Sequence, residues 1–292
     1  MTAANEMRLL LGWAAAASPW CWIAAMVLPV SFRFRRMRWW VSGLALLAAQ
    51  CAAEWLRWPT ARGALGLVVI AGSVQLLVQG WRERLRVRRA WHARFEERKP
   101  LRLAAPFEGR WRAVSSGPEI GRNHHLTARD QWFAVDWVRA DGRSRGSRIL
   151  SPVDGVVEHV EDGHRDKPAR RWIQAEREYP AGNYVSIRAG SNRTGHGARA
   201  SADDPVWVIL AHLERGSISV AAGDVVRMGD AIGRCGNSGN TTIPHLHIHA
   251  QPRAQVQAGA VWGIPVVFGE RTEAMRPGQV LVGVSAQKIG EA

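Results

Sequence analysis

Apolar positions are concentrated in three long segments within the first 81 residues. The first, Leu9–Phe32, contains no charged residue over 24 positions, and a helix of about 20 apolar residues is long enough to cross a bilayer. Trp39–Trp58 and Gly63–Trp81 follow, with tryptophans at their ends, where indole rings favour the membrane–water boundary. We therefore predict a membrane region with about three transmembrane helices in residues 1–81. The alternatives are a buried helical bundle or, for the first segment, a cleaved signal peptide.

A basic tract follows the third segment, with nine Lys or Arg side chains in Arg82–Arg102. Residues 1–103 hold 16 Lys/Arg and 5 Asp/Glu, a net charge of +11, whereas residues 104–292 hold 23 and 20, a net charge of +3. We expect residues 82–105 to be a juxtamembrane linker that runs on as a helix and places its cations at lipid phosphates. No recognition motif for nucleic acid accompanies the charge, so the expected partner is membrane lipid and not nucleic acid.

From about Pro106 the pattern changes to short β-rich runs separated by Gly, Asp, Asn and Pro. The clearest runs are Gly155–Val160, Asn183–Arg188, Val206–Ala211 and Val225–Ile232. Closely spaced strands separated by turns predict an antiparallel sheet. The predicted fold class is therefore a set of N-terminal transmembrane α-helices followed by an all-β antiparallel-sheet domain. The polar stretches Asp162–Glu178 and Gly190–Asp204 are expected to be long surface loops.

The predicted domain organisation has four parts. Residues 1–81 form the membrane region and residues 82–105 the basic linker. Residues 106–275 form the β-rich domain, and residues 276–292 are a C-terminal tail.

Histidines, and not cysteines, provide the candidate chemistry. The three cysteines form no CxxC pair, so neither a disulfide framework nor a cysteine zinc site is indicated, and Cys235 is interpreted as a small residue at a turn. His245 and His247 form a His-Leu-His triplet. Alternate residues of a strand face the same side, so one pocket can receive both imidazoles. His249 continues this face, either as a third member or as the outer end of the strand. Taken alone, the triplet could also be a polar strand edge.

Further candidates lie upstream of the triplet. Asp136 interrupts an apolar run, and a carboxylate in such a run is costly unless it is paired or bound to a metal. His124 and His125 precede it, and His212 ends an apolar strand. Catalytic zinc sites use three protein ligands, commonly His and carboxylate, and leave a position for water. One histidine of the 124/125 pair, Asp136 and one histidine of the triplet would supply that set.

Five motifs occur in order through the β-rich region: Ser151–Val157, Gly182–Val185, Ala211–Leu213, Val220–Gly236 and Asn237–His247. In this order they are highly specific, and residues 120–250 resemble the lysostaphin-type (LytM-like) zinc metalloendopeptidases, which are peptidoglycan hydrolases. The resemblance implies an all-β metallopeptidase domain with one zinc ion and with peptide crosslinks of peptidoglycan as the substrate.

The resemblance also implies the metal ligands. Asp136 and His247 match two of them, and His125 or His124 matches the third, with His125 preferred. Two positions depart from the family pattern. The usual His-x-x-x-Asp spacing is stretched to eleven residues from His125 to Asp136, and the family's Glu after the triplet is replaced by His249.

The remaining two positions match catalytic residues. By the resemblance, His245 is the general base and His212 the second catalytic histidine, which orients water or stabilises the oxyanion. The expected mechanism uses a water that zinc activates and a proton that His245 passes to the leaving amine.

The predicted function is therefore that of a membrane-anchored zinc metalloendopeptidase acting on peptidoglycan. The alternatives are a catalytically quiet LytM-like module that activates another wall hydrolase, and a membrane protease with a protein substrate. The expected location is the bacterial inner membrane, with the peptidase domain on the periplasmic or outer side. The arginines in Arg33–Arg38 and in the basic tract favour the opposite orientation by the positive-inside rule.

Overall fold

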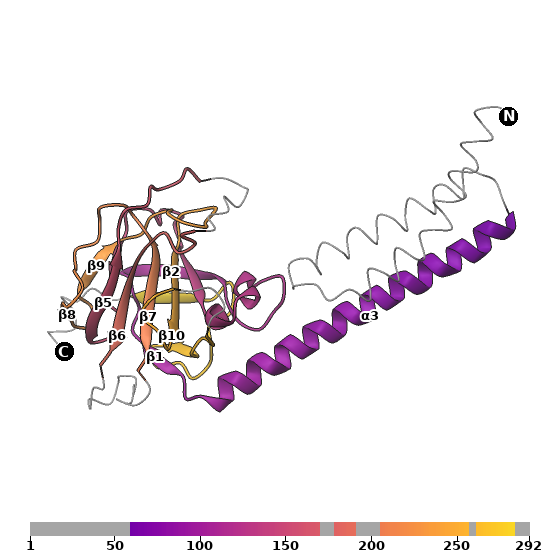
Figure 1. Ribbon diagram of the computed structural model, residues 1–292, viewed down its shortest axis with the longest axis horizontal. Coiled ribbons are helices and arrows are strands. Elements are labelled where there is room, and N and C mark those ends of the chain that lie inside the picture. Colours follow the sequence, from indigo (N-terminus) through magenta and orange to yellow (C-terminus); the bar gives the residue numbers. More distant parts are fainter. Residues whose placement is uncertain (1–58, 170–177, 191–204, 257–260, 284–292) are drawn as a thin grey trace. The chain divides into compact units, whose positions relative to one another are not determined.

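The computed structural model describes residues 59–169, 178–190, 205–256 and 261–283 of the chain (Figure 1). In the first turns of the helix that begins at residue 59, it describes the backbone only. The apolar segments predicted at Leu9–Phe32 and Trp39–Trp58 lie outside these residues. The chain divides into two compact units, Met1–Arg86 and Val87–Ala292. The second unit contains all of the described strands.

Helix α3 spans Pro59–Glu97. Its first residue is a proline, whose fixed φ suits the first helical position and whose missing N–H costs nothing there. A second proline, Pro100, follows shortly after the last turn, where helices commonly stop. The third predicted apolar segment, Gly63–Trp81, and most of the basic tract are therefore helical. No helix in the described part of the chain combines the length and the apolarity that a membrane crossing needs.

The β-rich region forms an antiparallel sheet of eight strands, which confirms the predicted class of this domain. In sheet order the strands are β12 (Val280–Gly283), β2 (Gly109–Ser115), β3 (Val135–Arg139), β10 (Leu246–Gln251), β7 (Trp207–Leu213), β6 (Asn183–Ala189), β5 (Gly155–Glu161) and β8 (Val225–Val226). Two small sheets complete the fold. An antiparallel pair joins β4 (Arg148–Leu150) to β9 (Ala231–Arg234), and a parallel pair joins β1 (Leu101–Leu103) to β11 (Val266–Phe268). The run predicted at Val225–Ile232 is thus two strands, because a turn with Gly229 at φ 94° separates them.

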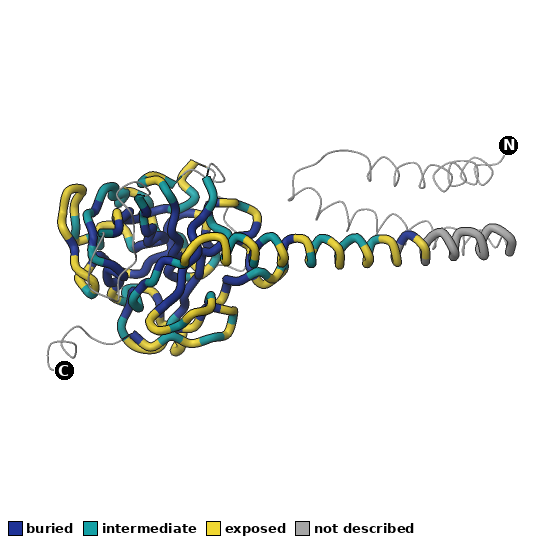
Figure 2. Tube along the Cα trace, turned by 90° about the horizontal axis from the view of Figure 1, so that it is seen from below, coloured by how far each residue is buried: buried dark blue, intermediate teal, exposed yellow. Residues whose placement is uncertain are grey.

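The central strand β10 is buried along its whole length. Figure 2 shows buried residues, in dark blue, concentrated in the interior of the β domain. Its apolar side chains, Leu246, Ile248 and Ala250, belong to the main hydrophobic core. Its intervening residues are His247, His249 and Gln251, and because side chains alternate across a strand these three face the other side of the sheet. The sheet therefore has one apolar face that forms the core, and on its other face β10 presents a row of polar side chains beside a small apolar cluster of Tyr184, Ile209 and Ala211.

A smaller hydrophobic cluster joins the end of α3 to the segment between His125 and Asp136. Trp91 packs against Phe95 and Phe133, with ring centroids 5.1 Å apart in both cases. The indole N–H of Trp91 also donates to the carbonyl oxygen of Trp132 at 3.0 Å. The segment that stretches the spacing between His125 and Asp136 thus has a packing role, because it covers the last turns of the helix.

We expect Trp91→Ala to destabilise the second unit by about 3–5 kcal/mol, the usual cost of truncating a buried tryptophan. The indole is 3 % exposed, so its loss leaves a cavity and an unpaired carbonyl. Guanidinium unfolding followed by circular dichroism measures the change. The matched control is Arg88→Ala on the exposed side of the same helix, which should change stability by less than about 0.5 kcal/mol. Equal stabilities for the two variants would contradict this role for Trp91.

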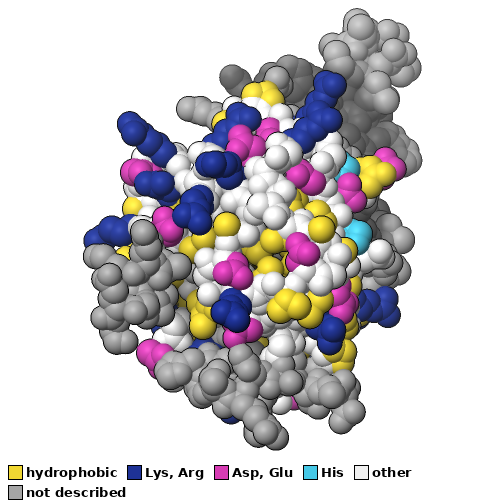
Figure 3. Space-filling model, turned by 90° about the vertical axis from the view of Figure 1, so that its left-hand side faces the viewer, with side chains coloured by type: hydrophobic (Ala, Val, Ile, Leu, Met, Phe, Trp, Pro, Cys, Tyr) yellow, Lys and Arg dark blue, Asp and Glu magenta, His cyan; other side chains and the backbone are white. Residues whose placement is uncertain are grey.

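The surface of the β domain carries charges of both signs. Figure 3 shows one face, on which Lys and Arg side chains are interspersed with Asp and Glu. This mixture agrees with the low net charge of residues 104–292.

Candidate metal centre

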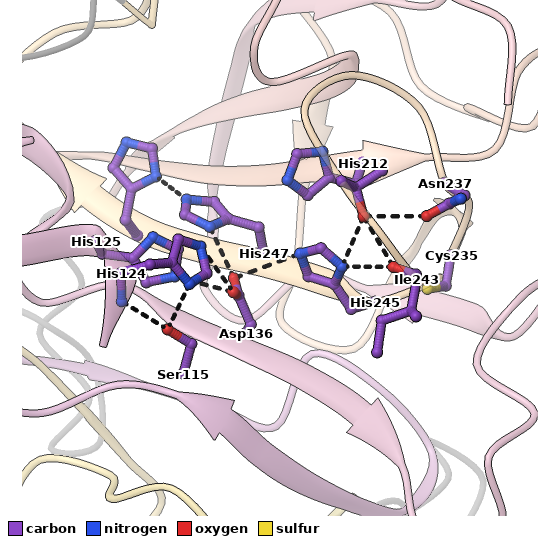
Figure 4. Close-up of polar contacts among 12 residues, drawn as sticks. Ser115, His124, His125, Asp136, His212, Cys235, Asn237, Ile243, His245 and His247 are labelled. Atoms are coloured by element: carbon purple, nitrogen blue, oxygen red, sulfur yellow. Dashed lines mark hydrogen bonds and ion pairs between the residues drawn. The ribbon is translucent and has the colours of Figure 1, made fainter. Parts of the chain in front are cut away.

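The face of the sheet opposite the main core brings together polar residues that are far apart in the sequence. Strands β3 and β10 are antiparallel neighbours, and their register places Asp136 directly opposite His247. Side chains at directly opposed positions lie side by side on the same face. His125 comes from a short 3-10 helix, His124–Thr127, whose first turn is capped by the side chain of Asn123. The predicted ligands thus converge on Asp136 (Figure 4).

The carboxylate of Asp136 contacts four imidazoles. Its Oδ2 lies 3.0 Å from Nε2 of His125 and 3.5 Å from Nε2 of His124. Its Oδ1 lies 2.9 Å from Nδ1 of His247 and 3.6 Å from Nε2 of His245. Burial alone would raise the pKa of Asp136, but the adjacent imidazoles of His125, His245 and His247 outweigh burial and hold this pKa well below its ordinary value. The carboxylate is therefore charged at neutral pH.

These donors fit a metal ion. Two atoms bound to one tetrahedral zinc at 2.0–2.1 Å lie about 3.3 Å apart, and the contacts of Asp136 with His125 and His247 are 3.0 and 2.9 Å. Both ring nitrogens of His125 are buried without a hydrogen-bond partner, since the contact with Asp136 is close but lacks hydrogen-bond geometry. A buried nitrogen without a partner is rare and requires an explanation, and a lone pair directed at a cation provides one.

His124 is a second candidate beside His125. One atom each of His124, His125 and Asp136 lies within 4.8 Å of the others. The side chain of His124 is 69 % exposed, whereas that of His125 is 3 % exposed. In addition, Nδ1 of His124 contacts the hydroxyl of Ser115 at 3.0 Å. His125 therefore suits a buried ligand position better, because its nitrogens lack any other partner.

His245 and His212 lie next to this cluster, with ring centroids 4.7 Å apart. Nδ1 of His245 lies 2.7 Å from the carbonyl oxygen of Ile243, and Nδ1 of His212 lies 2.8 Å from that of Ser238. A carbonyl oxygen can only accept, so both Nδ1 atoms carry the proton. Burial, and next the neighbouring His245, lower the pKa of His212 to about 3. His212 is thus neutral at neutral pH, with Nε2 as a free base.

The backbone at His212 is unusual. Its φ is 62°, the one positive value outside glycine among the described residues. The pairing of β6 with β7 skips a residue here, since Asn183 pairs with Leu213 and Tyr184 with Ala211. His212 is therefore the extra residue of a β-bulge, a device that redirects a side chain. Without the bulge its imidazole would follow the regular alternation of the strand.

Two glycines bring the turn that holds His212 close to strand β6. Gly182 has φ 61°, and a Cβ at this position would lie 2.5 Å from the carbonyl carbon of Ser238. A Cβ at Gly239 would lie 2.4 Å from the nitrogen of Gly182. Only glycine allows this approach, which places the Ser238 carbonyl oxygen at Nδ1 of His212.

We expect Gly182→Ala to lower the free energy of unfolding by at least about 2 kcal/mol, since a left-handed non-glycine residue alone costs 1–3 kcal/mol. The displaced turn should also reduce catalytic activity. The control is Gly142→Ala, which has a similar φ of 77° but open space around the added Cβ. Denaturant unfolding of both variants separates the clash from the backbone strain. A Gly182→Ala variant as stable as Gly142→Ala would contradict the close approach.

Burial raises the pKa of the Cys235 thiol. Cys235 directly follows strand β9 and forms an isolated bridge with Leu213, and it lies outside the group of candidate ligands. Three residues that hold the imidazoles in place were not predicted from the sequence. These are Ser238 and Ile243, whose carbonyl oxygens accept from the catalytic candidates, and Gln251, which accepts from His249. His249 itself was predicted to continue the face of the triplet, and the same alternation along β10 extends that face to Gln251.

The comparisons with known proteins agree with the motifs. Residues 138–258 match the model of peptidase family M23. The matched range begins just after Asp136, so the unusual segment with His125 lies outside it. A search of curated proteins found no match.

Solved structures similar to the chain include peptidases of this family. The catalytic domain of lysostaphin from Staphylococcus simulans shares 16 % identity over 51 % of this chain and 78 % of its own, with a TM-score of 0.29. A catalytic-domain mutant of the prophage-encoded M23 protein EnpA from Enterococcus faecalis shares 18 % identity over 57 % and 94 %, with a TM-score of 0.33. A zinc-containing peptidase from Vibrio cholerae shares 21 % identity over 56 % and 38 %, with a TM-score of 0.29. The domain that carries the motifs therefore matches peptidase family M23 over residues 138–258, in agreement with the resemblance that the sequence indicated.

Proposed function

We propose that this chain is a membrane-anchored zinc metalloendopeptidase that hydrolyses peptide crosslinks of peptidoglycan. The observation that carries the proposal is the convergence of His125, Asp136 and His247, with two further imidazoles whose free nitrogens lie beside them. The family match supports a peptidase, and the donor set supports zinc.

We assign the metal to His125 Nε2, Asp136 and His247 Nδ1. Zinc, when bound, lowers the pKa of a water molecule towards about 7 and polarises the scissile carbonyl. The three side chains are buried, so their geometry is held by the surrounding sheet. His124, with a side chain that is 69 % exposed, lies at the solvent-exposed edge of the cluster.

His245 is the proposed general base. Its Nδ1–H is fixed by the carbonyl of Ile243, so its Nε2 lone pair faces the carboxylate cluster at 3.6 Å from Asp136 Oδ1. From there Nε2 can accept a proton from the attacking water and deliver it to the leaving amine. The backbone carbonyl keeps the ring in the required tautomer throughout.

His212 is the proposed orienting residue. Its Nδ1–H donates to Ser238 and the ring is neutral, so Nε2 offers a lone pair and not a proton. Of the two roles that the resemblance allows, this favours accepting a hydrogen bond from the attacking water over donating to the oxyanion.

Two other functions use the same fold. A LytM-like module that only activates another hydrolase would not need five convergent metal and catalytic residues, and their presence favours an enzyme. A protease with a protein substrate would keep the whole site, so only substrate assays distinguish it from a wall hydrolase.

The proposal is tested with the purified full-length chain. Metal analysis should give about one zinc per chain, the number that one three-ligand site holds. The zinc-loaded protein should release new peptide amines from isolated sacculi, and His245→Ala should not. Cleavage of protein substrates alone would favour the membrane protease. Zinc binding without any cleavage would favour the activating module.

We further propose that the apolar segments in residues 1–81 anchor the chain in the bacterial inner membrane, with the peptidase domain on the periplasmic or outer side. Hydropathy and terminal tryptophans support the anchor, and the location of the substrate supports the orientation. Fusions to the C-terminus test this. Alkaline phosphatase should be active and green fluorescent protein dark, and the reverse pattern would place the domain in the cytoplasm.

A further inference from the structure

The polar face of β10 continues beyond the triplet as a chain of hydrogen bonds. Nε2 of His247 lies 2.9 Å from Nδ1 of His249, and Nε2 of His249 lies 3.2 Å from Oε1 of Gln251. The three residues are 5 %, 1 % and 0 % exposed, respectively. Water therefore has little access to these contacts, and each proton must lie on one partner or the other.

At the Gln251 end of this series of hydrogen bonds, the donors and acceptors are fixed. The amide nitrogen of Gln251 donates to the carbonyl oxygens of Arg253 at 2.8 Å and Gln255 at 3.0 Å. Both of those oxygens can only accept, so the amide cannot be turned around without losing two hydrogen bonds. Its Oε1 consequently faces His249 as an acceptor, and Nε2 of His249 must carry the proton.

The position of the proton on His249 in turn determines the tautomer of the proposed metal ligand, His247. His249 is buried between a neutral amide and another imidazole, an environment that disfavours a charged ring. With its proton on Nε2, a neutral His249 presents a lone pair on Nδ1. His247 must donate to that lone pair from Nε2, which leaves Nδ1 of His247 without a proton.

This tautomer of His247 affects its contact with Asp136. Nδ1 of His247 lies 2.9 Å from Asp136 Oδ1, and with the proton on Nε2 both atoms are acceptors. Two acceptors at this distance repel each other unless a cation lies against both. A metal ion bound by the two atoms resolves the conflict.

We propose that Gln251 and His249 are positioning residues that hold His247 in the Nε2–H tautomer, so that Nδ1 is presented to the metal. The inference rests on the proposed zinc site and deepens it. Outer hydrogen-bond partners of this kind orient a ligating histidine and raise its basicity. Here an imidazole and an amide take the place of the family's Glu after the triplet, and the final acceptor is neutral.

The tautomers themselves are the first test. In the zinc-loaded full-length chain, labelled with 15N at histidine, two-bond proton–nitrogen spectra should show His249 and His247 protonated at Nε2. Nδ1 of His249 should have the shift of an unprotonated nitrogen. A proton on Nδ1 of His249 would overturn the inference, and this measurement requires no variant to fold.

The second test measures zinc affinity with a competing chelator. His249→Phe keeps a ring of similar size but removes the acceptor, and it should weaken zinc binding about 10- to 100-fold, as loss of an outer-shell partner does. Gln251→Leu should also weaken it, because His249 is then free to take the other tautomer. The control His159→Phe, on strand β5 and stacked on Tyr184, should retain the original affinity.

The outcomes separate this inference from the proposed function. Zinc binding by the unaltered chain together with unchanged affinity in both variants overturns the positioning role alone. Failure of the unaltered chain to bind zinc overturns both. Circular dichroism of the metal-free variants identifies a variant that has lost its fold, in which case the tautomer spectra of the unaltered chain decide the question.

Discussion

Replacing His247 by alanine is expected to abolish stoichiometric zinc binding, whereas replacing His245 leaves zinc bound and removes activity. His247 Nδ1 lies 2.9 Å from Asp136 Oδ1 and is one of the three proposed ligands. Its loss should weaken zinc binding by more than the 10- to 100-fold that an outer-shell partner is worth. The measurement is metal content after dialysis, together with an affinity from chelator competition.

His245→Ala should behave differently because it leaves the three ligands in place. Turnover should fall by about 10² to 10⁴, the usual contribution of a positioned acid–base group, with zinc retained at one equivalent per chain. His212→Ala should resemble it, while His159→Ala on strand β5 should retain both zinc and activity. Loss of zinc from His245→Ala with retention in His247→Ala would reverse the two assignments. Full activity in both variants would reduce the triplet to a polar strand edge.

Asp136→Asn is expected to have an equally large effect with little change of shape. The carboxylate contacts His125, His247, His124 and His245, and asparagine preserves its volume but not its charge. Neutral amides are poor zinc ligands compared with carboxylate, so zinc binding and peptidase activity should both be lost. Circular dichroism should show the β fold intact.

The matched control is Asp141→Asn. Asp141 lies just beyond the end of β3 and pairs with Arg139 at the surface, so its carboxylate does not reach the cluster. That variant should bind zinc and hydrolyse substrate like the unaltered chain. Wild-type zinc affinity in Asp136→Asn would show that the ion, if bound, is held by other residues.

Local sequence was sufficient to predict the class of the domain and several of its strands, but not β2 or β12. Runs such as Asn183–Arg188 agree with observed strands to within a residue or two, because strand alternation and turn residues are local properties. Asp136 was identifiable since a carboxylate in an apolar run requires a partner. The segments before residue 59 lie outside the described residues, and their membrane role stays a prediction.

Features that depend on distant contacts could not be predicted. The bulge at His212 arises from a register shift between β6 and β7, and the left-handed φ of this residue has no signature in its side chain. The packing of Trp91 on Phe133 joins segments about forty residues apart. The direction of the Gln251 amide depends on the path of the chain after β10, which no spacing rule encodes.

The position of β10 also has a consequence for synthesis of the chain. This strand lies between β3 and β7, yet both of those strands precede it in the sequence by at least 30 residues. Until residues 246–251 leave the ribosome, β3 and β7 each present an unpaired edge, and such edges invite aggregation. Pairing Asp136 with His247 closes a loop of 111 residues, a slow, non-local step in folding. The nascent domain is therefore most vulnerable to aggregation just before its last histidines appear, and the proposed zinc site can form only once β10 has been inserted between β3 and β7.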